Sequence, residues 1–215
     1  MPFAPWFSTV AEFDSAVWDS VVVAHAEWRN RLHELAAAVV LGSVARNDGG
    51  RRLNTGFVCE TALTLVHDKY YLPDENGFWE ASWYDRGAGD FAPVLVGDAL
   101  VGFQICTELW FTDRARAYGK QGVHLIAGPR TTGKAVNKWL VAGRATAVVS
   151  GAYCLSSNRC GVHETGIEFG GAGWIIDPDG EVIGITSDDT PFITAEIDLA
   201  RAEAAKQTYP RYVKD

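Results

Sequence analysis

Apolar residues recur at helical spacing near the start of the chain. Between Val17 and Leu35 they follow one another at steps of three, four and seven, which predicts an amphipathic helix. The residues on this face are Val17, Val21, Trp28, Leu32 and Leu35. The apolar run at 38–44 ends before Asn47-Asp48-Gly49-Gly50, so it predicts a buried strand followed by a turn.

The rest of the chain alternates between strand and helix patterns. Residues 55–66 predict one long strand, and residues 68–89 predict a long aromatic-rich loop of a kind that is usually functional. Further strands are expected at 94–96, 100–105, 123–127, 153–156 and 174–176, helices at 113–121 and 136–149, and two short strands after a turn at 178–180. Gly97-Asp98 predicts a hairpin. The alternation predicts an α/β fold in a single domain over 1–215, with helices covering the sheet faces.

Composition restricts the class of partner. The chain has 215 residues, of which 47% are hydrophobic, so it can bury a core. Its net charge of −8 provides no basic surface for nucleic acid or for an anionic membrane. The chain contains no run of 18 apolar residues, so no membrane-spanning helix is predicted. The four cysteines form no paired motif, which favours a reduced, cytoplasmic interior.

Cys106 is the strongest candidate for a nucleophile. It ends the apolar run 101–105 and comes just before a predicted helix, so the chain turns sharply there. A nucleophile at such a turn is exposed, and the backbone N–H groups that follow it point at the reacting carbon. The alternative is a buried cysteine that acts as a small apolar side chain.

The long loop carries three further charged candidates. Lys69 could stabilise an oxyanion, and Glu75 or Glu80 could act as a general base in an aromatic pocket. A solvated position is the alternative for each of them. Arg130 could pair with a substrate carboxylate, and a structural arginine is the alternative there.

A second motif suggests a different activity. Residues 128–134, GPRTTGK, match the pattern of a phosphate-binding loop between a strand and a helix. Ala135 replaces the hydroxyl residue that would ligate magnesium. Cys154, Cys160 and His163 fit no tetrahedral zinc pattern.

Taken in order, several segments resemble the nitrilase superfamily of carbon–nitrogen hydrolases. They are DKYYLP at 68–73, GFWE at 77–80, GFQICTELWF at 102–111, RATA at 144–147, SNR at 157–159 and DPDG at 177–180. They cover nearly the whole chain in the family's order. The resemblance implies an α-β-β-α sandwich and a Glu–Lys–Cys triad.

The resemblance also implies a role for each candidate. Cys106 attacks an amide or nitrile carbon, and Lys69 with the backbone N–H of Thr107 holds the oxyanion. Glu80 is the family's additional pocket glutamate, which positions the substrate and supports the lysine. Water then hydrolyses the acyl-enzyme after the amine has left. No metal or organic cofactor is implied, and a homo-oligomer is expected.

The start of the sequence departs from the family's pattern. In the family, the general-base glutamate lies before an apolar, aromatic-rich loop that resembles residues 2–7 here. We therefore expect an N-terminally incomplete sandwich, in which the family's first strand, first helix and glutamate have no counterpart. Glu12 lies past this loop and is expected to be a solvated carboxylate at the start of a helix.

The leading hypothesis is a cytoplasmic amidase or N-carbamoyl-type amidohydrolase, since residues 78–80 resemble carbamoyl-hydrolysing members. Aromatic residues that could line an acyl pocket, or else belong to the core, are Trp6, Phe7, Trp79, Trp83 and Trp110. Two alternatives stay open. One is an inactive relative that binds a small amide or serves as an assembly subunit, and the other is a nucleotide binder that uses residues 128–134.

Overall fold

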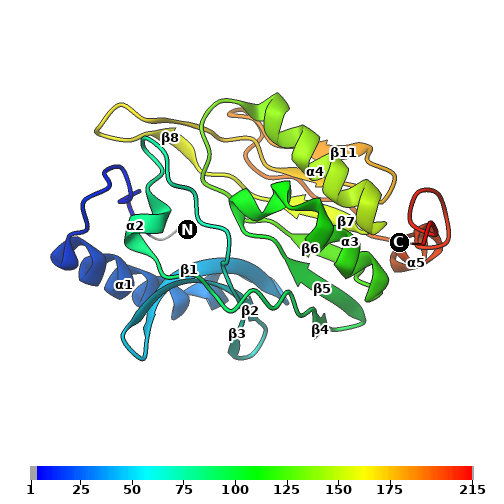
Figure 1. Cartoon of the computed structure of the whole chain (residues 1–215), viewed down its shortest axis with the longest axis horizontal. Coiled ribbons are helices and arrows are strands. Elements are labelled where there is room, and N and C mark those ends of the chain that lie inside the picture. The colour runs from blue at the N-terminus through cyan, green and yellow to red at the C-terminus, as the bar shows by residue number, and fades with distance from the viewer. Residues whose placement is uncertain (1–3, 215) are drawn as a thin grey trace. The chain divides into compact units, whose positions relative to one another are not determined.

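The computed structural model describes residues 4–214, which form two compact units. The first unit extends to Asp90 and includes Val162–Ile167, and the second contains Phe91–Gly161 and the chain from Glu168 onwards. Each unit has its own sheet, shown in Figure 1. The expectation of a single domain stays a prediction. Among the described helices, none combines the length and the apolar character that crossing a membrane requires.

The first unit packs a helix against an antiparallel sheet. Its elements are α1 (Ser15–Arg29), the 3₁₀ helix η1 (Leu32–Leu35), β1 (Val40–Asp48), β2 (Arg51–Cys59) and β3 (Leu63–Asp68). The strands lie in the order β1-β2-β3, and α1 contacts β1. Gly49 and Gly50, with φ of +55° and +85°, form the predicted turn between β1 and β2.

The predicted helix is present, but its buried face is a different one. The helix ends at Arg29, and its buried side chains are Trp18, Val21 and His25. Val17 and Trp28 are exposed. The apolar pattern was misleading because a histidine, which is not counted as apolar, fills one of the positions on the inner face.

The long strand expected at 55–66 is wrong. The chain reverses at Glu60, whose N–H donates to Ala62 O at 3.2 Å, and β2 and β3 pair as a hairpin. This turn contains no glycine, proline, asparagine or aspartate, so the sequence carries none of the usual turn signals. Phe57 of β2 packs with Leu32 and Val44 in the core of this unit.

Most of the candidate pocket aromatics of this unit belong to its core. Trp6, Phe7 and Trp83 are buried, and Phe7 meets Trp83 edge-on with ring centroids 5.1 Å apart. Trp6 Nε1 donates to Gly77 O at 2.7 Å, which fixes the loop after β3. That loop contains the short helix α2 (Glu80–Trp83) and the half-buried Trp79.

The second unit is built on a mixed six-stranded sheet in the order β11-β10-β7-β6-β5-β4. Its strands are β4 (Val94–Val96), β5 (Ala99–Phe103), β6 (Leu125–Ala127), β7 (Tyr153–Ser156), β10 (Trp174–Ile176) and β11 (Val182–Ile185). The helices are α3 (Thr112–Lys120), α4 (Val136–Ser150) and α5 (Leu199–Ala205), with a 3₁₀ helix η2 (Cys106–Trp110). β5, β6 and β7 run parallel, as the expected strand–helix alternation requires.

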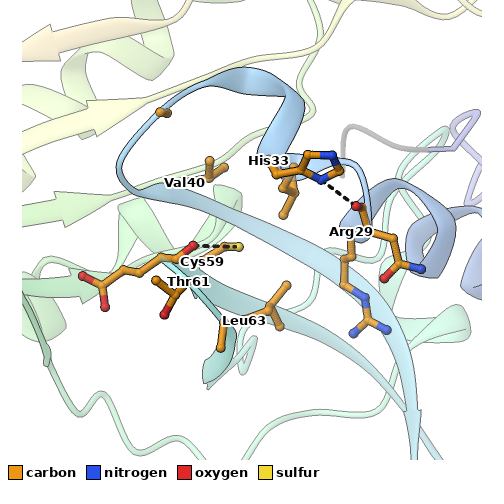
Figure 2. Close-up of a pocket in the computed structure, with 11 residues that line it drawn as sticks. Arg29, His33, Val40, Cys59, Thr61 and Leu63 are labelled. Carbon is orange, nitrogen blue, oxygen red and sulfur yellow. Dashed lines mark hydrogen bonds between the residues drawn. The ribbon is translucent and has the colours of Figure 1, made fainter.

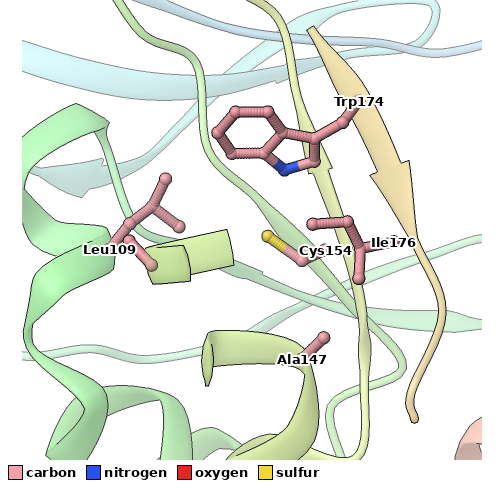
Figure 3. Close-up of a cluster of buried hydrophobic side chains, with 6 residues drawn as sticks. Leu109, Ala147, Cys154, Trp174 and Ile176 are labelled. Atoms are coloured by element: carbon pink, nitrogen blue, oxygen red, sulfur yellow. The ribbon is translucent and has the colours of Figure 1, made fainter. Parts of the chain in front are cut away.

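The packing of α4 on this sheet forms the core of the second unit. Leu109, Ala147, Cys154, Trp174 and Ile176 are buried together, as Figure 3 shows. A Cβ at Gly143 of α4 would lie 2.9 Å from Trp174 and Ile176, so only glycine allows this approach. The expected helices at 113–121 and 136–149 and the hairpin at Gly97 are confirmed.

The end of the chain differs from the sequence pattern. Of the two strands expected after the turn at 178–180, only β11 occurs among the described residues. A two-stranded sheet of β8 (Cys160–Val162) and β9 (Glu168–Gly170) was not expected. Residues 191–198 keep a strand-like alternation of exposure without belonging to a strand. A strand needs a hydrogen-bonded partner, and the alternation of side chains does not reveal one.

Candidate active site

Cys106 occupies a strained turn at the end of β5. Its φ of +54° is one of only two positive values at non-glycine residues in the described chain. Such a conformation is uncommon for an L-residue and is often found at functional sites. The expected exposure is wrong, since the side chain is buried, with 6% exposed, and Sγ contacts Thr131 O at 3.8 Å. The predicted sharp turn is present. Cys106 begins η2, and the predicted helix follows as α3 from Thr112.

Buried polar groups hold this turn in place. The carboxylate of Glu108, which is fully buried, accepts a hydrogen bond from Ile105 N at 2.8 Å. Gln104 Nε2 donates to Glu108 O at 2.9 Å. Glu108 was not among the residues predicted from the sequence, although a carboxylate two residues after the candidate nucleophile, inside an apolar run, was a signal. The backbone around Cys106 is therefore organised before any substrate binds.

Lys69 and Glu80 form a buried ion pair in the first unit. Lys69 Nζ and Glu80 Oε2 lie 2.6 Å apart, with side chains 0% and 4% exposed. The backbone of Lys69 is fixed by its N–H, which donates to Asn54 O, and by Gly87 N, which donates to Lys69 O. Burial and the negative charge of Glu80 raise the pKa of Tyr84 well above its usual value. Both members of this pair were candidates from the sequence.

The other carboxylate candidates do not join this pair. Glu75 is exposed at the tip of the loop, which agrees with the solvated alternative. Glu12 is also exposed, and it lies before α1 begins at Ser15. Of the three loop candidates, the structure brings together only Lys69 and Glu80.

Thr107 and Trp110 both lie on η2, close to Cys106 in the chain. Thr107 is half-buried and directly follows the nucleophile candidate. The Trp110 ring is 38% exposed and lies 5.6 Å from the Trp139 ring of α4. Lys138 Nζ lies 5.8 Å from the centre of the Trp110 ring. Trp110 thus offers an aromatic surface next to the turn, and its contact with substrate stays a prediction.

Arg130 is buried, which differs from the picture of a free substrate-binding arginine. It is 3% exposed, and Nε donates to Ser156 Oγ at 2.6 Å. Nη1 donates to Thr132 Oγ1 at 3.2 Å and Nη2 to Ala172 O at 2.6 Å. Burial lowers the pKa of its guanidinium to about 10. Its pairing with a substrate carboxylate stays a prediction.

The loop at 128–134 does not form a phosphate cradle. The backbone N–H of Thr132 donates to Asn158 Oδ1 and that of Arg130 donates to Ser157 O. Lys134 is exposed and forms an ion pair with Glu168. A phosphate-binding loop needs these N–H groups and this lysine to face the ligand. The nucleotide-binding alternative is therefore not favoured.

A surface cavity of about 420 Å³ lies elsewhere in the first unit. It is lined by Arg29, Asn30, Leu32, His33, Ala37, Val40, Cys59, Glu60, Thr61, Ala62 and Leu63 (Figure 2). These residues come from the end of α1, from η1, from the start of β1 and the chain just before it, and from the turn between β2 and β3 with the strand ends beside it. None of the predicted site residues is among them.

Comparison with known proteins identifies the family. The family model for carbon-nitrogen hydrolases matches residues 7–207. The omega-amidase NIT2 of Xenopus tropicalis is 27% identical over 188 residues, which covers 82% of this chain and 67% of that protein. N-carbamoylputrescine amidase of Oryza sativa subsp. japonica is 26% identical over 157 residues, which covers 66% of this chain and 52% of that protein. The chain thus spans between one half and two thirds of the length of these relatives.

Solved structures share the fold. A carbon-nitrogen hydrolase from Helicobacter pylori G27 gives a TM-score of 0.82 at 23% identity and covers 95% of this chain and 78% of that chain. A mutant of the amidase from Nesterenkonia sp. AN1 gives 0.68 at 19% identity, covering 78% and 64%, and shows covalent addition of the acetamide moiety of fluoroacetamide at the active site cysteine. The predicted α/β fold of the nitrilase type is confirmed. The chain belongs to the carbon-nitrogen hydrolase family.

Proposed function

We propose that the protein hydrolyses linear amides or N-carbamoyl compounds through an acyl-enzyme on Cys106. The observation that carries this proposal is the backbone of Cys106, which is held at φ +54° at the end of β5. A strained, preorganised turn presents a nucleophile and the N–H groups that follow it. Membership of the family supplies the class of reaction.

The reaction takes place in two steps. Cys106 Sγ attacks the carbonyl carbon, the C–N bond breaks, and the thiol proton leaves on the nitrogen, so that a linear amide gives ammonia and a neutral thioester, and an N-carbamoyl compound gives its amine and a carbamoyl thioester. Water then restores the thiol. The product is the carboxylic acid from an amide, or carbamic acid, which breaks down to carbon dioxide and ammonia, from an N-carbamoyl compound. The second step needs a proton acceptor for the water, and general-base catalysis typically contributes about 10²–10⁴ in rate.

The remaining site residues take the roles that the family resemblance gives them. Lys69 and the backbone N–H of Thr107 hold the oxyanion, and Glu80 supports the lysine and positions the substrate. The buried 2.6 Å ion pair supports this assignment, because it fixes the Lys69 ammonium within its own unit. Trp110 provides an apolar surface for the acyl group, and Arg130 is a candidate partner for a substrate carboxylate.

The relatives guide the choice of substrate. Those named omega-amidase suggest a terminal amide, and those named N-carbamoylputrescine amidase suggest a carbamoyl group. In both groups the bond to be broken joins a nitrogen to a carbonyl carbon in a planar unit. We further propose a cytoplasmic, homo-oligomeric protein, and the four free cysteines support the reducing compartment.

Ammonia release from a panel of linear ω-amides and N-carbamoyl amines tests the proposal. We compare the wild-type protein with Cys106→Ala, which loses the nucleophile, and with Cys160→Ala at an exposed cysteine as a matched control. Turnover by the wild type and by Cys160→Ala, together with background rates for Cys106→Ala, is the expected result. Intact-mass measurement after mixing shows whether an acyl group remains on the protein.

The outcomes separate the two steps. An acyl adduct on Cys106 with no more than one equivalent of ammonia supports the nucleophile but contradicts turnover by these 215 residues. Equal turnover by Cys106→Ala overturns the whole proposal. Binding of an amide with neither an adduct nor turnover also overturns the proposed function and points to the inactive-subunit alternative.

A further inference from the structure

Arg130 carries a buried charge without a carboxylate partner. An arginine that is 3% exposed is usually paired with an acid, because an uncompensated charge is costly to bury. Among the described residues, the acceptors of its hydrogen bonds are Ser156 Oγ, Thr132 Oγ1 and Ala172 O, all of them neutral. The hydrogen bonds orient the guanidinium, but they do not neutralise it.

Two tryptophan rings enclose the same group. The guanidinium carbon lies 3.7 Å from the centre of the Trp174 ring and 5.6 Å from that of Trp139. Cation–π contact stabilises a cation modestly and excludes water, which strengthens any remaining electrostatic interaction. Its pKa of about 10 keeps Arg130 charged at neutral pH. The protein thus maintains a dry, fixed positive charge at this position.

Two thiols lie in the surroundings of this charge. Cys154 packs in the same cluster as Trp174, whose ring stacks on the guanidinium, and Cys106 contacts the residue that follows Arg130. Cys154 is fully buried on β7, and burial raises its pKa to about 12, so it stays a neutral thiol. The Sγ of Cys106 contacts the carbonyl of Thr131, the residue after Arg130. Of these two thiols, Cys106 is therefore the one that can become an anionic partner of Arg130.

We propose that Arg130 is a positioning residue that supplies the counter-charge of the Cys106 thiolate. The inference rests on the proposed function and assigns this arginine to the nucleophile in place of a substrate carboxylate. The thiolate is the attacking form, so a fixed cation beside it raises the fraction that can react. The thiol gives its proton to water when the thiolate forms, and the leaving amine takes a proton back from water as the C–N bond breaks. Once the S–C bond has formed, the sulfur is neutral again.

Alkylation of Cys106 by iodoacetamide tests the proposal without any substrate. The rate is followed across pH 5–10 by peptide mass spectrometry, which separates Cys106 from the other cysteines. Arg130→Met removes the charge and keeps much of the volume, whereas Arg130→Lys keeps the charge. The control is Arg211→Met, since the Arg211 side chain is also only 5% exposed in this unit, but it is paired with Asp179 and donates to Ala205 O and Val148 O.

We expect Arg130→Met to alkylate Cys106 about tenfold or more slowly at pH 7, with the midpoint of the profile at higher pH. At the alkaline end its rate should approach that of the wild type, because only the thiolate fraction has changed. Arg130→Lys should restore most of the neutral-pH rate, and Arg211→Met should keep the wild-type midpoint. Where Arg130→Met does not fold, Arg130→Gln replaces it.

An unchanged midpoint in a folded, charge-free variant overturns the proposal. A rate that is lowered equally at every pH also overturns it, because that result indicates a purely structural arginine. Alkylation does not require turnover, so this experiment remains decisive even if the amide panel gives no ammonia. If the panel gives ammonia but the midpoint does not move, the proposed function survives and the role of Arg130 does not.

Discussion

Lys69 and Glu80 test how much of the site depends on a buried charge pair. Lys69→Met leaves the carboxylate of Glu80 buried, 3% exposed, without the ammonium 2.6 Å away. We expect a loss of about 3–5 kcal/mol in the free energy of unfolding, measured by urea titration. The double variant Lys69→Met/Glu80→Leu should lose less than Lys69→Met alone, because no unpaired charge remains.

The exposed pair of Arg31 and Glu34 provides the control for this experiment. Their side chains are 51% and 48% exposed, and Arg31 Nη2 lies 2.8 Å from Glu34 Oε2. Solvent screens such a pair, so Arg31→Met should shift the urea midpoint far less than Lys69→Met. Equal effects of the two substitutions would contradict a special role for burial at Lys69.

At the scale of single residues, the candidate nucleophile could be predicted from the sequence, but the hydrogen-bond partners of the buried residues near it could not. Cys106 was predicted from the apolar run before it, and the structure gives it the sharp turn that was expected. The neutral acceptors around Arg130 come from residues up to 42 positions away, so no local pattern reveals them. Glu108 was missed because a carboxylate in a short helix usually points to solvent.

At the scale of elements, the cap of α1 offers a direct test. Asp14 precedes the helix, and its side chain accepts from Ala16 N at 2.8 Å and from Val17 N at 3.1 Å. Asp14→Ala should destabilise the protein by about 1 kcal/mol, measured by urea unfolding. The control is Asp19→Ala in the same helix, where an exposed side chain caps nothing and alanine favours the helix. A loss at Asp19 as large as that at Asp14 would show that the cap is not the cause.

Elements with strong local signals were predicted well, and those defined by distant partners were not. α3 and α4 occur where helices were expected, and the turn at Gly97 has the positive φ that glycine allows. The reversal at Glu60 was missed because none of its residues favours a turn. Residues 191–198 show the opposite error, since a strand-like pattern occurs there without a hydrogen-bonded partner among the described residues.

At the scale of the whole molecule, the order of motifs was more informative than any one motif. The segments from 68 to 180 appear in the family's order, and the family model matches residues 7–207. A single match of GxxxxGK had no such support, and its lysine is paired with Glu168 in the structure. The division into two compact units was not predicted, because composition changes little along the chain.

Acid should destabilise the molecule through His25. Burial lowers the pKa of His25 from 6.5 to about 4, so between these values the unfolded chain binds more protons than the folded one. The stability contributed by the neutral His25 ring is therefore fully present above pH 6.5 and is lost as the pH falls toward 4. The net charge of the chain moves toward zero near its pI of about 5.1, so general repulsion decreases over most of the same range.

The expected loss between pH 7.5 and 4.5 is about 2–3 kcal/mol in the free energy of unfolding, from 1.36 kcal/mol for each pKa unit. Urea titrations at the two pH values measure it for the wild type, for His25→Gln and for His33→Gln, an exposed histidine of η1. His25→Gln should be less stable at pH 7.5, because the ring is 1% exposed and well packed, but its stability should vary much less with pH. His33→Gln should keep the wild-type slope. If the free energy of unfolding of His25→Gln varies with pH as much as that of the wild type, the acid sensitivity comes from another group. Protonation of His25 on the buried face of α1 is then not its cause.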